Sequence, residues 1–289
     1  MRDTPGATLR RLVEARKGTL LPGAANALTA RIIEELGFEA VYVTGAGLTN
    51  TWFGMPDHGF MGLSDMASHT SAIRDAVSLP LICDIDTGFG NAVNVHHAVR
   101  VMERAGANAV QLEDQVMPKK CGHFLGKSIV ETSEMCGKIK AAVDARNSGD
   151  FLIIARTDAR AIDGFEAAVE RCHAFEEAGA DVIFLEAPES VEELRALPQA
   201  IKAPQLVNIV VGGKTPMLPN EEFAAMGFSL VLYANVALQA AISGMTTALS
   251  TLKAGDNVLE KDGLVAGFEE RQRVVRKPFF DALEKKYAE

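Results

Sequence analysis

Short apolar runs alternate with amphipathic stretches along most of this 289-residue chain. Four times an amphipathic stretch stops at a Gly and an apolar run follows within three residues, at 35–43, 104–112, 177–185 and 225–233. Gly suits the left-handed end of a helix, and a continuous apolar run is typical of a parallel strand that is buried on both faces. Each segment therefore predicts a helix followed by a strand.

Four further apolar runs fit the same role and bring the expected strands to eight; they lie at 19–21, 80–84, 151–156 and 205–209. Helical patterns separate them, and one places Cys172 on an apolar face, in the core. This alternation favours a (β/α)8 TIM-type barrel over a doubly wound open sheet. We expect the barrel at residues 1–245 and a C-terminal helical extension at 246–289, whose apolar stripe needs another surface.

Composition narrows the partners and the compartment. A net charge of -9 with scattered Lys and Arg argues against nucleic acid or an anionic membrane as a partner. The four cysteines lie far apart without a CxxC pair, which fits neither a disulfide framework nor a structural zinc site. The N-terminus has no apolar segment of signal-peptide length, and no run approaches the roughly 18 to 20 apolar residues of a membrane span. We expect a cytoplasmic protein.

Acidic residues gather where the expected strands end, which is where barrels carry their chemistry. Asp84 and Asp86 follow the third strand, Glu113 follows the fourth, and Asp57 lies in the loop after the second. Clustered acids repel one another unless they share a cation or a proton. Hard oxygen ligands without a Cys/His set favour Mg2+ or Mn2+, so the pattern predicts a divalent metal site.

The other strand ends offer groups for an anionic substrate. The turn after the second strand, which contains Tyr42, Thr44, Gly45 and Ala46, can present backbone N–H groups to a carboxylate or phosphate. Arg156, at the end of the fifth strand, is either part of a structural ion pair or a planar fork for a substrate carboxylate. The remaining ends supply Glu186 and Asn208, and a loop with Thr215 and Pro216 follows Asn208.

The connection after the fourth strand is unusually long. Roughly 16 residues pass before helical periodicity resumes near Glu131, against about 2 to 6 in most strand-to-helix connections. Cys121 stands there between Lys119-Lys120 and His123, with Gly122 and Gly126 placed as hinges. Nearby cations favour the thiolate. We interpret the segment as a gate that delivers a reactive thiol, and the alternative is an ordinary solvated basic loop.

These motifs, in this order over roughly residues 5 to 245, resemble the isocitrate lyase and phosphoenolpyruvate mutase superfamily. The segment Lys119 to His123 is similar to the signature of its carbon–carbon lyases, whereas the mutases generally lack that Cys. The resemblance implies Mg2+ with Asp86 closest and Asp57, Asp84 and Glu113 around it. It also implies a homotetramer that exchanges C-terminal helices. The implied substrate-binding residues are Tyr42, Thr44, Gly45, Ala46, Lys119, Lys120, Gly122, Asn208, Thr215 and Pro216.

The same resemblance guides the choice of substrate. In 2-methylisocitrate lyases an Arg typically follows Cys-Gly-His, and here Phe124 stands there, which points to a smaller, less charged far end. We expect a lyase that cleaves a 2-hydroxy dicarboxylate of the 2,3-dimethylmalate type to pyruvate and a short carboxylate. The catalytic set would be Cys121 as general acid, with His123, Arg156 and Glu186. The alternatives are 2-methylisocitrate lyase, oxaloacetate acetylhydrolase and an inactive ligand-binding barrel.

Overall fold

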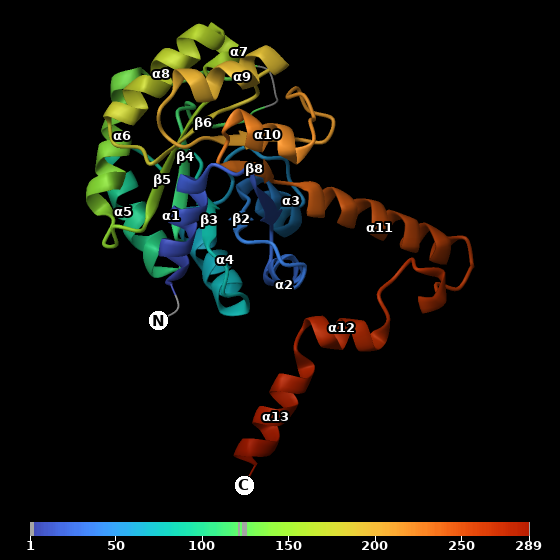
Figure 1. Ribbon diagram of the computed structural model, residues 1–289. Coiled ribbons are helices and arrows are strands. Elements are labelled where there is room, and N and C mark those ends of the chain that lie inside the picture. The colour runs from blue at the N-terminus through green and yellow to red at the C-terminus, as the bar shows by residue number, and fades with distance from the viewer. Residues whose placement is uncertain (1–2, 121, 123–125, 289) are drawn as a thin grey trace.

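The computed structural model describes residues 3–120, 122 and 126–288, and eight parallel strands form its centre (Figure 1). Their order around the barrel is β6-β5-β4-β3-β2-β1-β8-β7, and a bridge between Ile183 and Gln205 joins the two ends of that series. The TIM-type barrel is therefore confirmed, and the open-sheet alternative is wrong. The strands are β1 (Thr19–Ala24), β2 (Val41–Val43), β3 (Leu81–Asp84), β4 (Ala109–Glu113), β5 (Leu152–Thr157), β6 (Val182–Leu185), β7 (Leu206–Asn208) and β8 (Leu230–Tyr233).

The first strand is longer than its apolar run suggests, because it continues through Pro22 and Gly23. Residues 19–22 of β1 pair with β8, and Gly23 and Ala24 pair with β2. The missing N–H of Pro22 thus falls where β1 passes from one neighbour to the other. Gly23 is needed there, since a Cβ would overlap the backbone of Ala234.

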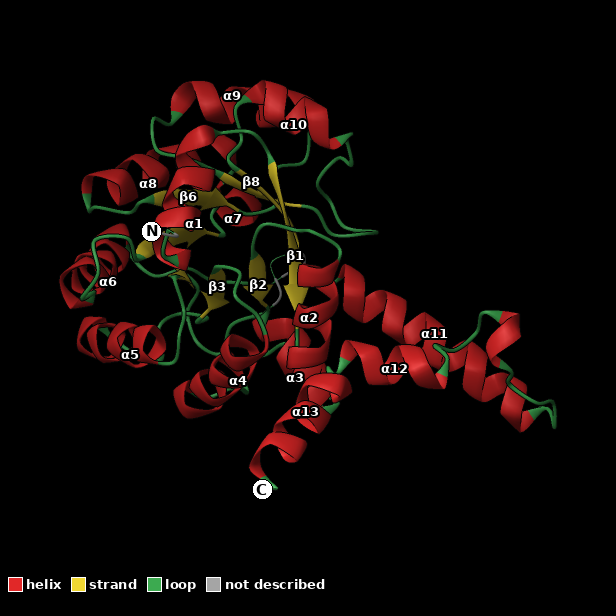
Figure 2. Ribbon diagram, turned by 60° about the horizontal axis from the view of Figure 1, so that its bottom comes forward, coloured by secondary structure: helices red, strands yellow, loops and turns green. Residues whose placement is uncertain are grey.

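Helices surround the strands and cover one end of the barrel (Figure 2). Inside, Leu9 and Val13 of α1 are buried against strand residues such as Leu21 and Leu230, so α1 closes the N-terminal end. A second core, which includes Cys172, lies between the strands and the outer helices. The helices are α1 (Pro5–Ala15), α2 (Ala27–Glu35), α3 (Gly45–Phe53), α4 (Leu63–Ala76), α5 (Ala92–Arg104), α6 (Thr132–Ala145), α7 (Arg160–Asp163), α8 (Phe165–Glu177), α9 (Val191–Ala200) and α10 (Asn220–Met226).

The C-terminal helices extend from the barrel (Figures 1 and 2), and one of them returns to α2, where Arg273 Nη2 donates to Glu35 Oε2 at 3.0 Å. They are α11 (Val236–Lys253), the short η1 (Glu260–Asp262), α12 (Phe268–Val274) and α13 (Lys277–Tyr287). No residue of α11 is buried, and its apolar side chains Ile242, Met245, Leu249 and Leu252 are each more than half exposed. The boundary expected at residue 245 falls within this helix and stays a prediction. Among the described residues, no helix has the length and apolar character needed to cross a membrane.

Candidate active site

Two predicted acids lie at the carboxyl end of β3. Asp84 ends the strand, and Asp86 follows in a turn with a left-handed φ of 49°. Asp tolerates this conformation better than most residues because its short polar side chain can hydrogen-bond locally. The Asp86 N–H donates to Asp84 Oδ1 at 3.0 Å, and both side chains are buried. The turn therefore holds two carboxylates side by side in the barrel mouth.

Lys119 is the cation nearest to these acids. Its Nζ lies 2.6 Å from Asp57 Oδ1 and 2.8 Å from Asp86 Oδ1, and its side chain is 3% exposed. Burial by itself disfavours the ammonium, but Asp86 and Glu113 outweigh it and raise the pKa of Lys119 well above its usual value. The structure thus places Lys119, which we expected among the substrate-binding residues, as the counter-ion of the acids.

Lys119 and Arg156, which also pairs with Glu113, bring only two positive charges to the four carboxylates predicted to surround the metal. Burial raises the pKa of Asp86 to about 6, and Asp84 and Asp57 add to this against the effect of Lys119. Burial also raises the pKa of Glu113 well above its usual value. Glu113 Oε1 is buried and has no hydrogen-bond partner in the described chain. The site is therefore short of positive charge.

A divalent cation fits this shortage. Within residues 3–120, 122 and 126–288, no three Asp, Glu, His or Cys side chains converge closely enough to hold a metal by themselves. Mg2+ does not require three, because it usually keeps several waters and binds through one or two carboxylates. Asp86 and its neighbours Asp57, Asp84 and Glu113 fit a hydrated Mg2+ of that kind.

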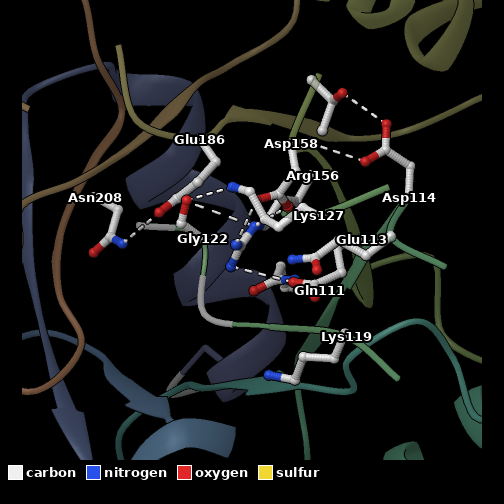
Figure 3. Close-up of polar contacts among 12 residues, drawn as sticks. Gln111, Glu113, Asp114, Lys119, Gly122, Lys127, Arg156, Asp158, Glu186 and Asn208 are labelled. Atoms are coloured by element: carbon white, nitrogen blue, oxygen red, sulfur yellow. Dashed lines mark hydrogen bonds and ion pairs between the residues drawn. The ribbon is translucent and has the colours of Figure 1, made fainter. Parts of the chain in front are cut away.

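Arg156, near the end of β5, lies among three carboxylates (Figure 3). Its Nε and Nη2 donate to the two oxygens of Asp158 at 3.0 and 3.1 Å. Its Nη1 lies 3.2 Å from Glu113 Oε2, and its Nε lies 4.0 Å from Glu186 Oε2. The structural ion pair is therefore present. Because a guanidinium has five N–H donors, Arg156 can bind these carboxylates and still offer a donor to a substrate.

Glu186 follows β6, and Asn208 is the last residue of β7. Asn208 Nδ2 donates to Glu186 Oε1 at 3.4 Å, and both residues are buried. The structure thus joins them to Arg156 in one group. Thr215 and Pro216 lie farther along, in the loop between β7 and α10, where Thr215 is buried and Pro216 is half-buried.

The turn after β2 becomes the start of α3 and faces the acids. Thr44 caps this helix, accepting from Gly47 N–H at 3.1 Å, and Ala46 lies in the first turn. A Cβ at Gly45 would stand 3.0 Å from Asp84 Oδ2, so the helix backbone approaches the acids closely. Free N–H groups at a helix N-terminus favour anions. This turn can therefore receive a carboxylate next to the acids.

Tyr42 does not lie in the open mouth. Its side chain is buried inside the barrel among the apolar interior residues, and its hydroxyl donates to Gln111 Oε1 at 2.5 Å. Burial, with Asp84 next, raises the pKa of the Tyr42 phenol well above its usual value. Tyr42 therefore stays a neutral hydrogen-bond donor to Gln111 inside the barrel.

The long connection between β4 and α6 reaches over Arg156. Cys121 and His123, with Phe124 and Leu125, lie outside the described residues. Gly122 is described, and a Cβ there would lie against Arg156 Nη2 and 2.5 Å from Glu186 Oε1. The Lys120 ammonium donates to the carbonyl of Gly126 at 2.9 Å, within the connection itself. The Lys119 to His123 segment thus brings Gly122 against the Arg156 group.

Sequence reasoning gave no role to several residues that hold this group. Asp114 accepts from Thr157 Oγ1 at 2.7 Å and from Asp158 N–H at 3.0 Å, and Arg171 Nε donates to it at 3.0 Å. Lys127 Nζ reaches Asp158 Oδ1 at 2.7 Å. The sequence feature that could have identified Asp114 and Asp158 is their position directly after β4 and β5, because residues at such positions meet at the barrel mouth.

Comparison with known proteins identifies the family. The model of the family described as phosphoenolpyruvate phosphomutase matches residues 9–253. The chain belongs to this family. The superfamily predicted from the sequence is thereby confirmed, and the match spans all eight strands and the whole of α11.

Relatives within the family are named lyases. The chain is 47% identical over 250 residues to the 2,3-dimethylmalate lyase of Eubacterium barkeri, covering 86% of each protein. It is also 47% identical over 259 residues to the 2-methylisocitrate lyase of Aeropyrum pernix, covering 90% of this chain and 80% of that protein. The predicted enzyme class, a carbon–carbon lyase, is confirmed by these relatives.

Solved structures of the superfamily share the fold. A crystal structure of 2,3-dimethylmalate lyase superimposes with a TM-score of 0.92 at 34% identity, covering 99% of this chain and 96% of that one. A phosphonopyruvate hydrolase complex with oxalate and Mg2+ gives 0.89 at 32% identity, covering 99% and 100%. Superfamily members therefore hold Mg2+ on this fold.

Proposed function

We propose that this enzyme is an Mg2+-dependent lyase that cleaves a 2-hydroxy dicarboxylate with an alkylated C3, of the 2,3-dimethylmalate type, into pyruvate and a short monocarboxylate. The observation that carries the proposal is the arrangement of the barrel mouth. There the acids around Lys119, the guanidinium of Arg156 and the backbone of Gly122 from the Lys-Lys-Cys-Gly-His segment lie together. The 2,3-dimethylmalate lyase relative supports this substrate class.

The site is polarised in a way that suits such a substrate. Mg2+ bound at Asp86 would supply positive charge for the C1 carboxylate and C2 oxygen of a 2-hydroxy acid. The N–H groups at the start of α3 face the same acids and would orient that carboxylate. Arg156, which contacts Glu113, and Asn208, which donates to Glu186, are proposed to stabilise charge on the C4 carboxylate.

The bond changes then balance without an external reactant. The C2 hydroxyl gives its proton to water, the C2 oxygen forms a carbonyl, and the C2–C3 bond breaks. The electron pair moves to C3 and into the C4 carboxylate. Cys121 is proposed as the general acid whose thiol gives a proton to C3, with His123 as a further donor to the C4 carboxylate. Glu186 contacts both Arg156 and Asn208 and would fix the positions of their side chains during this step.

A second candidate is 2-methylisocitrate cleavage to pyruvate and succinate, because a 2-methylisocitrate lyase is an equally similar relative. Phe124, at the position after Cys-Gly-His, favours the smaller substrate. A coupled assay that reduces the released pyruvate with lactate dehydrogenase, run on 2,3-dimethylmalate and 2-methylisocitrate with Mg2+, decides between them, and turnover of oxaloacetate is followed by the release of oxalate. Turnover of none of these, with a ligand-induced rise in melting temperature, would support a non-catalytic barrel.

We further infer a homotetramer in which C-terminal helices are exchanged between subunits. The support is the exposed apolar surface of α11 and of α13, where Phe279, Phe280 and Tyr287 are also exposed. We also propose a cytoplasmic location, because Cys83, Cys136 and Cys172 are free thiols and a reducing compartment keeps thiols free.

A further inference from the structure

Lys127 joins the long connection to the barrel. It follows Gly126, yet its side chain is only 2% exposed. Its Nζ donates to Asp158 Oδ1 at 2.7 Å and also to the carbonyl oxygen of Gly122 (Figure 3). One ammonium therefore binds a residue of the barrel and a residue of the connection at the same time.

The backbone that carries Lys127 is itself fixed. Val116 N–H donates to the carbonyl of Ser128 at 2.8 Å, and Val130 N–H donates to the carbonyl of Asp114 at 2.8 Å. Arg171 Nη2 also donates to the Val130 carbonyl, at 2.7 Å. The two ends of the connection are thus hydrogen-bonded to each other, and this pairing fixes the backbone from which the Lys127 side chain enters the site.

Asp158 relays the contact to Arg156. The carboxylate that accepts from Lys127 also accepts from Arg156 Nε and Nη2, and it is fully buried. Gly122, the other partner of Lys127, packs against the same guanidinium. The contacts therefore close a ring: Lys127 binds Asp158 and Gly122, and both of these contact Arg156.

The other side of position 121 is anchored separately. Gln115 Nε2 donates to the Lys120 carbonyl at 2.8 Å, and the Lys120 N–H donates to Gln115 Oε1 at 2.9 Å. The two residues that flank position 121 in the sequence are thus each held by a side chain from an end of the connection. Of the two anchors, only Lys127 also contacts the Arg156 group.

We propose that Lys127 is a positioning residue for the reaction, which sets the backbone at Gly122 against the Asp158–Arg156 pair. The inference rests on the proposed function, because its purpose is to align the proton donor with the carbon that it protonates. A purely structural ion pair is the competing explanation. Removing one partner of a buried pair lowers stability in either case. A purely structural pair predicts a lower melting temperature with an unchanged kcat of the folded enzyme, so a loss of kcat at temperatures well below melting separates the two explanations.

The test compares Lys127→Met with Lys140→Met, which removes an exposed Lys from α6. We expect kcat to fall about 10- to 100-fold in Lys127→Met, because a misplacement near 1 Å has effects of that size. KM should change by less than about threefold, since KM here reflects substrate groups bound elsewhere in the mouth. Lys127→Arg, which keeps the charge and the donors, should recover part of kcat, and Lys140→Met should match the wild type.

Hydrogen exchange of the peptide covering 115–127 provides a readout without substrate, and we expect faster exchange in Lys127→Met only. Unchanged kcat and exchange in Lys127→Met, or equal losses in Lys140→Met, would overturn the proposal. If the wild type releases pyruvate from none of the substrates, the proposed function fails, and the exchange result alone decides whether Lys127 fixes the connection. If Lys127→Met does not fold, Lys127→Gln, which keeps an N–H donor, takes its place.

Discussion

Gly122→Ala tests the fit of the connection against the Arg156 group. The added Cβ would lie 2.5 Å from Glu186 Oε1 and 2.6 Å from Glu186 Cγ, and an ordinary contact begins at 3.4 Å, so the groups must separate by about 0.9 Å. A misplacement of that size costs about 100-fold in rate, or about 2.7 kcal/mol in the barrier. We expect kcat/KM to fall by this factor in the pyruvate assay.

Gly137→Ala in α6 is the matched control, because a Cβ there meets nothing within 4 Å. Ala is the better helix former, so this variant should be slightly more stable, with unchanged kcat/KM. Calorimetric titration of Gly122→Ala with Mg2+ should give the wild-type affinity, since the new Cβ contacts none of the predicted metal ligands. A Gly122→Ala enzyme within threefold of the wild type would refute the close packing of Gly122 on Arg156 and Glu186.

Three further changes test the other parts of the account. Asp86→Asn, chosen because Asn also tolerates the left-handed φ of 49°, should abolish measurable Mg2+ binding and Mg2+-dependent turnover at an unchanged melting temperature; full activity in EDTA would contradict the metal role. Cys121→Ser should lower kcat by about 100- to 10,000-fold with Mg2+ affinity retained, and near-normal turnover would exclude the thiol as general acid. Leu249→Glu places a charge on the exposed apolar face of α11 and should lower the mass measured by analytical ultracentrifugation. An unchanged tetramer would show that this face is not part of the subunit interface.

Much of the barrel follows from local pattern. Buried parallel strands read as continuous apolar runs, and the Gly at 106 and 179 adopts the positive φ that ends a helix before β4 and β6. The acids were found because a barrel brings its strand ends together, so that Asp86 and Glu113 meet although they are distant in sequence. These predictions need only the period of the pattern and the rule for where barrels carry chemistry.

The contacts of the long connection could not be predicted in the same way. Lys119 among the acids and Lys127 on Asp158 depend on the path of residues 114–131, which have no helical or strand period. The direction of α11 is a similar case. Its helical pattern is local, but whether it packs on its own barrel is decided by surfaces that its own sequence does not contain.

The most direct test of the proposed reaction is the cleavage of 2,3-dimethylmalate in D2O, followed by proton NMR. We predict equal amounts of pyruvate and propionate, with one deuterium at C2 of the propionate, because the solvent-exchanged thiol supplies the proton at C3. The reaction should stop when EDTA removes Mg2+. Intact substrate in the presence of Mg2+, or propionate without deuterium, would contradict the proposed carbon–carbon cleavage with protonation by a solvent-exchangeable acid.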